Sequence, residues 1–134
     1  MASNIDKFKV SQGDIIAAYK RIIGVAKNPC LVLFVMPGCE SCRYLEDDLG
    51  SIAEIREFDT ILVIEVRPDD IESCKLAGSF EVKEFPVAYV LVEGRIVSGW
   101  AGYDWTIPTD TRRTGLSEII DRALKLVNYC NGDK

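Results

Sequence analysis

The chain has 134 residues, of which 48% are hydrophobic and 28% charged, and its formal net charge is -5. This size and balance predict one globular domain over residues 1–134 rather than a disordered chain. Lysine and arginine do not cluster in the sequence, so we expect no nucleic-acid binding. The chain has no histidine, which excludes imidazole as a catalytic base or metal ligand.

The N-terminal segment, residues 1–7, lacks the apolar stretch and small-residue cleavage site of a secretory signal. Elsewhere no apolar run approaches the roughly 20 residues that a membrane helix needs. We therefore expect a cytoplasmic monomer without membrane contacts. In that compartment structural disulfides are uncommon, and a Cys-x-x-Cys pair is more often catalytic or metal-binding.

The first half of the chain alternates helix and strand patterns. Buried strands are indicated by apolar, β-branched runs, and helices by apolar residues at three- and four-residue spacing. The predicted elements are a short strand over 7–10, a helix over 15–26, a strand over 30–36, a helix over 42–57, a strand over 61–66 and a helix over 71–78. This order predicts a parallel pair of strands with right-handed crossovers.

The second half has a different pattern. Two short strands over 87–92 and 95–100 are joined by Glu93-Gly94, which predicts an antiparallel hairpin. The segment 99–115 is polar and rich in turn residues, so it is interpreted as a long loop, and loops of this length are usually functional or mobile. A last amphipathic helix is expected over 116–127, with Thr114 as its cap.

Cys39 and Cys42 form a Cys-x-x-Cys motif between a predicted buried strand and a predicted helix. A cysteine in the first turn of a helix has its thiolate stabilised by free N–H groups and the helix dipole. Cys42 falls on the apolar stripe one turn later, so it is expected to be buried and to act as a resolving thiol. A zinc site would need two further ligands, for which Cys74 and Cys130 are candidates.

The neighbours of Cys39 carry opposite charges. Glu40 should disfavour the Cys39 thiolate and raise the pKa of Cys39, whereas Arg43 should offset part of that effect. Because a less stable thiolate makes the reduced state less favoured, these residues predict a reducing couple.

Several features in register make the chain resemble the thioredoxin superfamily over residues 7–127. Besides Cys-x-x-Cys they are Phe85-Pro86 before a strand, Gly94 in the turn between strands and Gly102 after the last strand. The resemblance implies an α/β thioredoxin fold, with a mixed β-sheet of four to five strands flanked by helices on both faces. It also implies that Pro86 follows a cis peptide bond and faces the active-site sulfurs.

The motif departs from the usual thioredoxin pattern. Gly38 stands where the family has tryptophan, Glu40-Ser41 replaces Gly-Pro, and Leu33 replaces a buried acid. Without that acid, a water molecule or Glu65 is the candidate to relay the proton of Cys42.

The resemblance implies a thiol-disulfide oxidoreductase that reduces protein disulfides through Cys39 and Cys42, without a metal or organic cofactor. Electrons would come from a separate reductase. The implied substrate groove comprises Phe85-Pro86 and Ala101-Gly102-Tyr103, which Trp105 could extend. Two alternatives stay open: a glutaredoxin-like or disulfide-isomerase role, and a non-catalytic adaptor that binds a protein through the Phe85-Pro86 groove and the 99–115 loop.

The remaining residues have simpler interpretations. Cys30 is expected in the core, and Cys74 and Cys130 are either plain thiols or a second disulfide. The acidic run at residues 46–48 is interpreted as a solvated face, and Trp100 as a core residue.

Overall fold

The computed structural model describes residues 28–130, and the strand and helix predicted over 7–10 and 15–26 lie outside them. A mixed sheet contains four strands among the described residues: β1 (Cys30–Val35), β2 (Thr60–Glu65), β3 (Val87–Val92) and β4 (Arg95–Ala101). Their order is β2-β1-β3-β4, with β1 parallel to β2 and the other neighbours antiparallel. The parallel pair and the antiparallel hairpin are both as predicted.

Strand β1 is central because all six of its residues are apolar and buried. Its side chains alternate between two core clusters, with Leu31, Leu33 and Val35 in one and Cys30, Val32 and Phe34 in the other. A strand covered on both faces needs such an uninterrupted apolar run.

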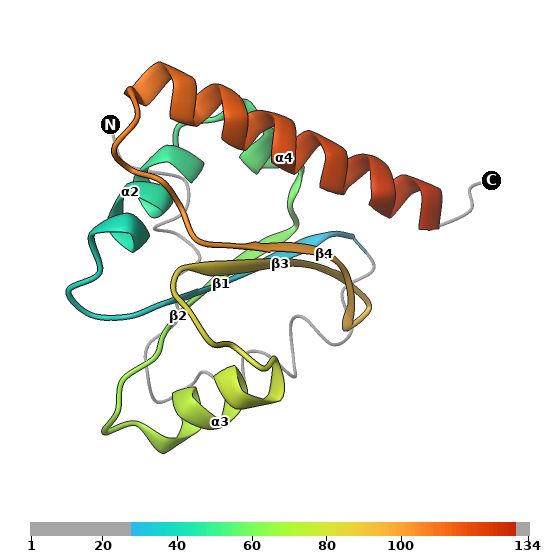
Figure 1. Ribbon diagram of the computed structural model, residues 1–134. Helices are drawn as coiled ribbons and strands as arrows, with labels where there is room; N and C mark the ends of the chain where they lie inside the picture. The colour runs from blue at the N-terminus through green and yellow to red at the C-terminus, as the bar shows by residue number, and fades with distance from the viewer. Residues whose placement is uncertain (1–27, 131–134) are drawn as a thin grey trace.

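Helices cover both faces of the sheet, as Figure 1 shows. Helices α2 (Glu40–Leu49) and α4 (Thr109–Cys130) lie on one side together with the short 3-10 helix η4 (Ala53–Glu57), and α3 (Ile71–Ser79) lies on the other. The larger core cluster fills the space under α2 and α4, while α3 covers a smaller cluster built around Phe34. The predicted fold class is therefore confirmed.

The helix predicted over 42–57 is wrong in its extent. Helix α2 ends at Leu49, where the N–H of Gly50 bonds back to the carbonyl of Glu46, and a separate 3-10 helix follows from Ala53. The apolar spacing continues through Ile52 and Ile55, which are both buried. Periodicity alone therefore did not reveal the break at Gly50 and Ser51.

The loop predicted over 99–115 is also wrong in its extent. Strand β4 continues to Ala101 and α4 already begins at Thr109, so only residues 102–108 connect them. Gly115 lies inside the helix, where a β-carbon would meet no atom within 4 Å, and Thr114 is not a cap. Turn-type residues suggested a loop, but an isolated glycine is tolerated inside a helix that gains tertiary packing.

The Glu93-Gly94 turn has the geometry expected of a tight hairpin. Both residues have positive φ, at 52° and 78° respectively, as two-residue turns that match the strand twist require. Within the described part of the chain, no helix is long and apolar enough to cross a membrane.

Candidate functional site: a disulfide at the start of helix α2

A disulfide joins Cys39 and Cys42, whose Cα atoms are 5.2 Å apart. Cys39 is the N-cap residue of α2, with extended backbone, and its sulfur accepts a hydrogen bond of 3.2 Å from the backbone N–H of Cys42. Cys39 is partly exposed, whereas Cys42 is only 2% exposed and belongs to the larger core cluster. The two sulfurs thus differ in access in the way that the sequence predicts.

The turn between β1 and α2 brings Cys39 to the surface. Gly38 has a φ of +74°, a left-handed conformation that glycine adopts more readily than any other residue. The chain leaves the buried end of β1 at Val35 and reaches Cys39, the N-cap residue of α2, four residues later. Glycine at the position where thioredoxins have tryptophan is therefore consistent with the backbone geometry.

An open pocket of about 250 Å³ lies beside the disulfide. It brings together five of the predicted site residues: Cys39, Glu40, Cys42, Arg43 and Glu65. The rest of its lining is Val35, Met36, Pro37, Gly38 and Glu46. Both cysteines of the disulfide and several charged side chains therefore line one pocket.

Three of the charged residues that line the pocket form ion pairs: Glu40 and Arg43 with each other, and Glu65 with Arg67 outside the pocket lining. Arg43 donates a hydrogen bond to the carboxylate of Glu40, and its guanidinium also lies 5.5 Å from the centre of the Tyr44 ring. Glu65 accepts two bonds from Arg67, at 2.6 and 2.9 Å. Arg43 therefore offsets Glu40 by pairing with that carboxylate directly.

The predicted substrate segments lie next to each other. The Phe85–Pro86 peptide bond is cis, and the N–H of Gly102 donates a 2.7 Å hydrogen bond to the carbonyl of Pro86. Phe85 and Cys39 pack against the same core cluster, and Ala101 at the end of β4 is exposed. None of these four groove residues lines the pocket beside the disulfide.

Comparisons with known proteins rest on structure alone, because no protein-family model and no curated sequence matches the chain. Oxidised thioredoxin O2 from Arabidopsis thaliana is similar with a TM-score of 0.60 and 13% identity, over 88% of this chain and 99% of that one. The chain has the thioredoxin fold.

Two further structures show the same fold. One describes the thiol-resolving mechanism of a yeast mitochondrial 1-Cys peroxiredoxin via glutathione and thioredoxin systems; its TM-score is 0.64 at 15% identity, over 90% of this chain and 99% of that one. The other is a complex of ferredoxin:thioredoxin reductase with thioredoxin f2, with a TM-score of 0.56 and 12% identity, over 86% of this chain and 92% of that one.

This thioredoxin fold contains a buried ionic network that sequence reasoning missed. Asp48 is completely buried, accepting bonds of 2.6 Å from the Tyr103 hydroxyl and 2.8 Å from Nε of both Arg112 and Arg113. Burial acts to raise the pKa of Asp48, but the hydrogen bonds from Arg112, Tyr103 and Arg113 outweigh it and lower the pKa. The interpretation of residues 46–48 as a solvated face is therefore wrong for Asp48.

The network anchors the loop between β4 and α4 to helix α2. Arg112 also donates to the carbonyl of Ile107 at 2.8 Å, and its guanidinium lies 4.9 Å from the centre of the Tyr44 ring. Trp105 stacks on the same Tyr44 ring, with ring centres 5.3 Å apart and planes 9° from parallel. The Tyr103 hydroxyl thus bonds to Asp48, and Trp105 remains 39% exposed beside Tyr44.

A signal for this network was present in the sequence. Asp48 comes three residues after Leu45, and Arg112 comes four residues before Leu116, so each charge lies in register with an apolar stripe. Charges at such positions are buried only when they are paired. The pattern could have marked them as partners across the core.

The other described cysteines are separate from the Cys39–Cys42 disulfide. Cys30 is 1% exposed, and burial, followed by the charge of Asp59, raises the pKa of its thiol. Cys74 is exposed and carries a free thiol, so the predicted option of a Cys74–Cys130 disulfide is wrong. Its helix α3 and helix α4 lie on opposite faces of the sheet (Figure 1). Within residues 28–130, no group of three or more acidic or cysteine side chains is placed to hold a metal ion.

Proposed function

We propose that this protein is a thiol-disulfide oxidoreductase that reduces the disulfides of other proteins. The observation that carries the proposal is the Cys39–Cys42 disulfide at the N-terminus of α2, with one sulfur accessible and the other buried. Disulfide exchange requires this division between an attacking thiol and a resolving thiol.

The reaction has two exchange steps. In the reduced protein the Cys39 thiolate attacks one sulfur of the substrate disulfide, and the other substrate sulfur leaves as a thiolate. Cys42 then attacks the Cys39 sulfur, which forms the Cys39–Cys42 disulfide and releases the second substrate thiolate. Glu65, which lines the same pocket as Cys42, or a water molecule would take the proton from Cys42 before the second step.

The substrate backbone would lie along Phe85-Pro86 and Ala101-Gly102. The 2.7 Å bond between Pro86 and Gly102 holds these two segments together, which supports a shared binding edge. Tyr103 would contribute through its backbone and ring, because its hydroxyl is bonded to Asp48. Trp105 would extend the edge on the side of Tyr44.

Electrons would come from a separate reductase. The similar thioredoxin f2 structure is a complex with ferredoxin:thioredoxin reductase, and the similar yeast structure concerns thiol resolution in a 1-Cys peroxiredoxin via glutathione and thioredoxin systems. Both support a role in which this protein takes electrons from a reductase and passes them to protein disulfides. We place this activity in the cytoplasm and expect the chain to act as a monomer.

Insulin reduction followed by turbidity, with dithiothreitol as the electron source, tests the proposal. The wild-type protein should accelerate precipitation, and Cys39→Ser should reduce the rate to that of dithiothreitol alone because the attacking thiol is lost. Cys74→Ser is the matched control, since Cys74 is an exposed free cysteine outside the site. It should retain full activity.

The same assay separates the alternatives. If the wild type is no faster than Cys39→Ser, the redox proposal fails and an adaptor role is the better interpretation. If glutathione with glutathione reductase supports turnover but a thioredoxin reductase does not, the glutaredoxin-like role replaces the thioredoxin-like one.

A further inference from the structure

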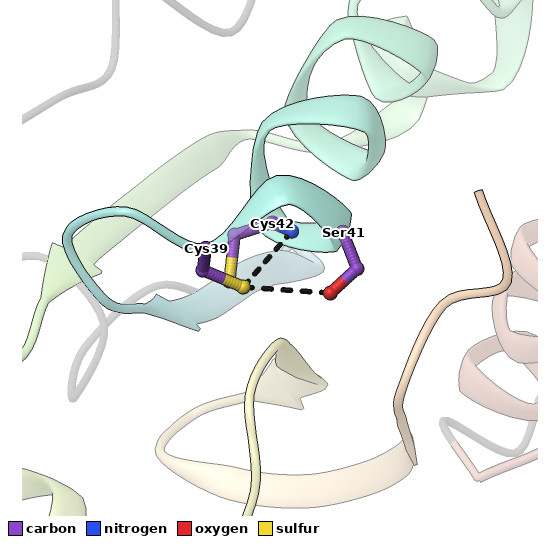
Figure 2. Close-up of a disulfide and its surroundings, with 3 residues drawn as sticks. All are labelled: Cys39, Ser41 and Cys42. Carbon is purple, nitrogen blue, oxygen red and sulfur yellow. Dashed lines mark hydrogen bonds between the residues drawn. A yellow bond between two sulfur atoms is a disulfide. The ribbon is translucent and has the colours of Figure 1, made fainter.

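Ser41, between the two cysteines, directs its hydroxyl at the accessible sulfur. The Ser41 Oγ lies 3.4 Å from the Cys39 Sγ. A disulfide sulfur carries no proton, so in this oxidised state the hydroxyl is the donor. Figure 2 shows that the Ser41 side chain and the Cys42 backbone nitrogen both point to the same sulfur.

We propose that Ser41 is a catalytic residue whose hydroxyl donates a hydrogen bond to the Cys39 sulfur and stabilises its thiolate. This inference deepens the proposed function and rests on it for its biological meaning. A thiolate is a stronger acceptor than a disulfide sulfur, and hydrogen bonds to a charged group favour the charged form. Together, Ser41 and the Cys42 N–H provide two donors to one sulfur.

The charged side chains around Cys39 indicate what the Ser41 hydroxyl contributes. The charged groups that share the pocket with Cys39 are Glu40, Arg43, Glu46 and Glu65, of which three are acidic. Arg43 is bonded to Glu40, so its charge is directed at that carboxylate. The Ser41 hydroxyl, a neutral donor 3.4 Å from the sulfur, therefore counteracts the effect of these carboxylates on the Cys39 thiolate.

Ser41 stabilises the Cys39 thiolate both in the first exchange step and when a dithiol reduces the protein, and it does not transfer its own proton. In the first step it lowers the cost of ionising Cys39 before the attack on the substrate sulfur. When a dithiol reduces the protein, its first thiolate attacks the accessible Cys39 sulfur and Cys42 leaves as a thiolate. The second thiolate of the dithiol then attacks the dithiol's own sulfur in this mixed disulfide, and Cys39 leaves as a thiolate that the same hydrogen bond stabilises. A better leaving thiolate leaves faster.

The test is the pH profile of Cys39 alkylation in the reduced protein. Iodoacetamide is reacted from acid to alkaline pH, and the modified peptides are quantified by mass spectrometry, so that Cys39 is followed separately from the exposed thiol of Cys74. Ser41→Ala should shift the Cys39 profile to higher pH and slow alkylation on its acid side roughly three- to tenfold, the effect of losing one such hydrogen bond. Ser41→Thr should restore the profile because it keeps the hydroxyl.

Ser51→Ala is the matched control on the same side of the fold. The Ser51 hydroxyl donates a hydrogen bond to the Asp47 carbonyl at the other end of α2. The Cys39 alkylation profile of Ser51→Ala should therefore match that of the wild type. The proposal is overturned if Ser41→Ala also matches the wild type, or if Ser41→Thr behaves like Ser41→Ala. Alkylation needs no protein substrate, so failure of the insulin assay alone would contradict only the reductase activity.

Discussion

The acidic side chains at the two ends of helix α2 differ in burial. At the N-terminal end, Glu40 and Arg43 form an ion pair whose side chains are 54% and 70% exposed. At the C-terminal end, Asp48 is completely buried and pairs with Arg112, which is 6% exposed. One helix thus carries an exposed pair beside the redox cysteines and a buried pair that ties it to α4.

This difference in burial gives the two ion pairs different roles, one in the chemistry of Cys39 and the other in the stability of the fold. An exposed ion pair is worth little to folding, because water and salt screen it, so residue 40 can adjust the chemistry of Cys39 at small cost. A buried carboxylate must be paired, because an uncompensated charge in the core is strongly destabilising. The buried end therefore holds the helix in place while the exposed end remains free to vary.

The largest expected effect on stability comes from breaking the buried ion pair between Asp48 and Arg112. Asp48→Ala leaves Arg112 buried without its partner and should lower the free energy of unfolding by about 3–5 kcal/mol. Asp47→Ala is the adjacent control: Asp47 is 71% exposed and pairs with Arg113 at 3.5 Å, so it should cost less than about 1 kcal/mol. Urea denaturation of both variants measures the contrast, and equal losses would remove the distinction between the buried and the exposed ion pair.

The second prediction is the pH dependence of the buried network. Because the folded-state pKa of Asp48 is lowered, its contribution is fully present above the unfolded pKa of about 3.9 and is lost as pH falls through the folded value. Burial and the bond to Asp48 raise the pKa of Tyr103, so that contribution is fully present below about pH 10 and is lost as pH rises through the folded value.

Urea unfolding of wild type and Asp48→Asn at a series of pH values checks the acid side. The wild-type advantage should be constant from about pH 5 to about pH 9 and should shrink below about pH 4, because protonation of the wild-type carboxyl removes the charge that the variant lacks. An advantage that is unchanged down to pH 2.5 would show that Asp48 does not stabilise the fold through its charge.

The smallest expected effect on stability is at the exposed end. Glu40→Gln should change the free energy of unfolding by less than about 0.5 kcal/mol. It should also speed Cys39 alkylation at acid pH by about two- to fivefold, since a charge that disfavours the thiolate is removed. Glu72→Gln, on α3 across the sheet, is the control. If Glu40→Gln leaves the alkylation profile unchanged, Glu40 does not tune Cys39.

Local patterns were sufficient for most of the fold. The apolar run at residues 30–36 predicted the central strand, since only a strand covered on both faces needs such a run. The sequence placed Cys42 in the core because Cys42 and Leu45, three residues apart on a helix, share one apolar face. It placed Cys39 at the start of the helix, where the thiol is accessible. Glu93-Gly94 predicted the hairpin by its turn chemistry.

What the sequence by itself determined is therefore the fold and the position of the redox pair, because neighbouring residues specify a strand, a turn and a helix start. Only the tertiary structure decided that Asp48 meets Arg112, 64 residues away, and that α4 begins at Thr109 rather than after Gly115. Both depend on partners distant in the chain, whose pairing offsets the cost of burying charge. The contact between Ser41 and the Cys39 sulfur likewise could not be predicted from the sequence, because a serine near a helix start has several possible hydrogen-bond partners.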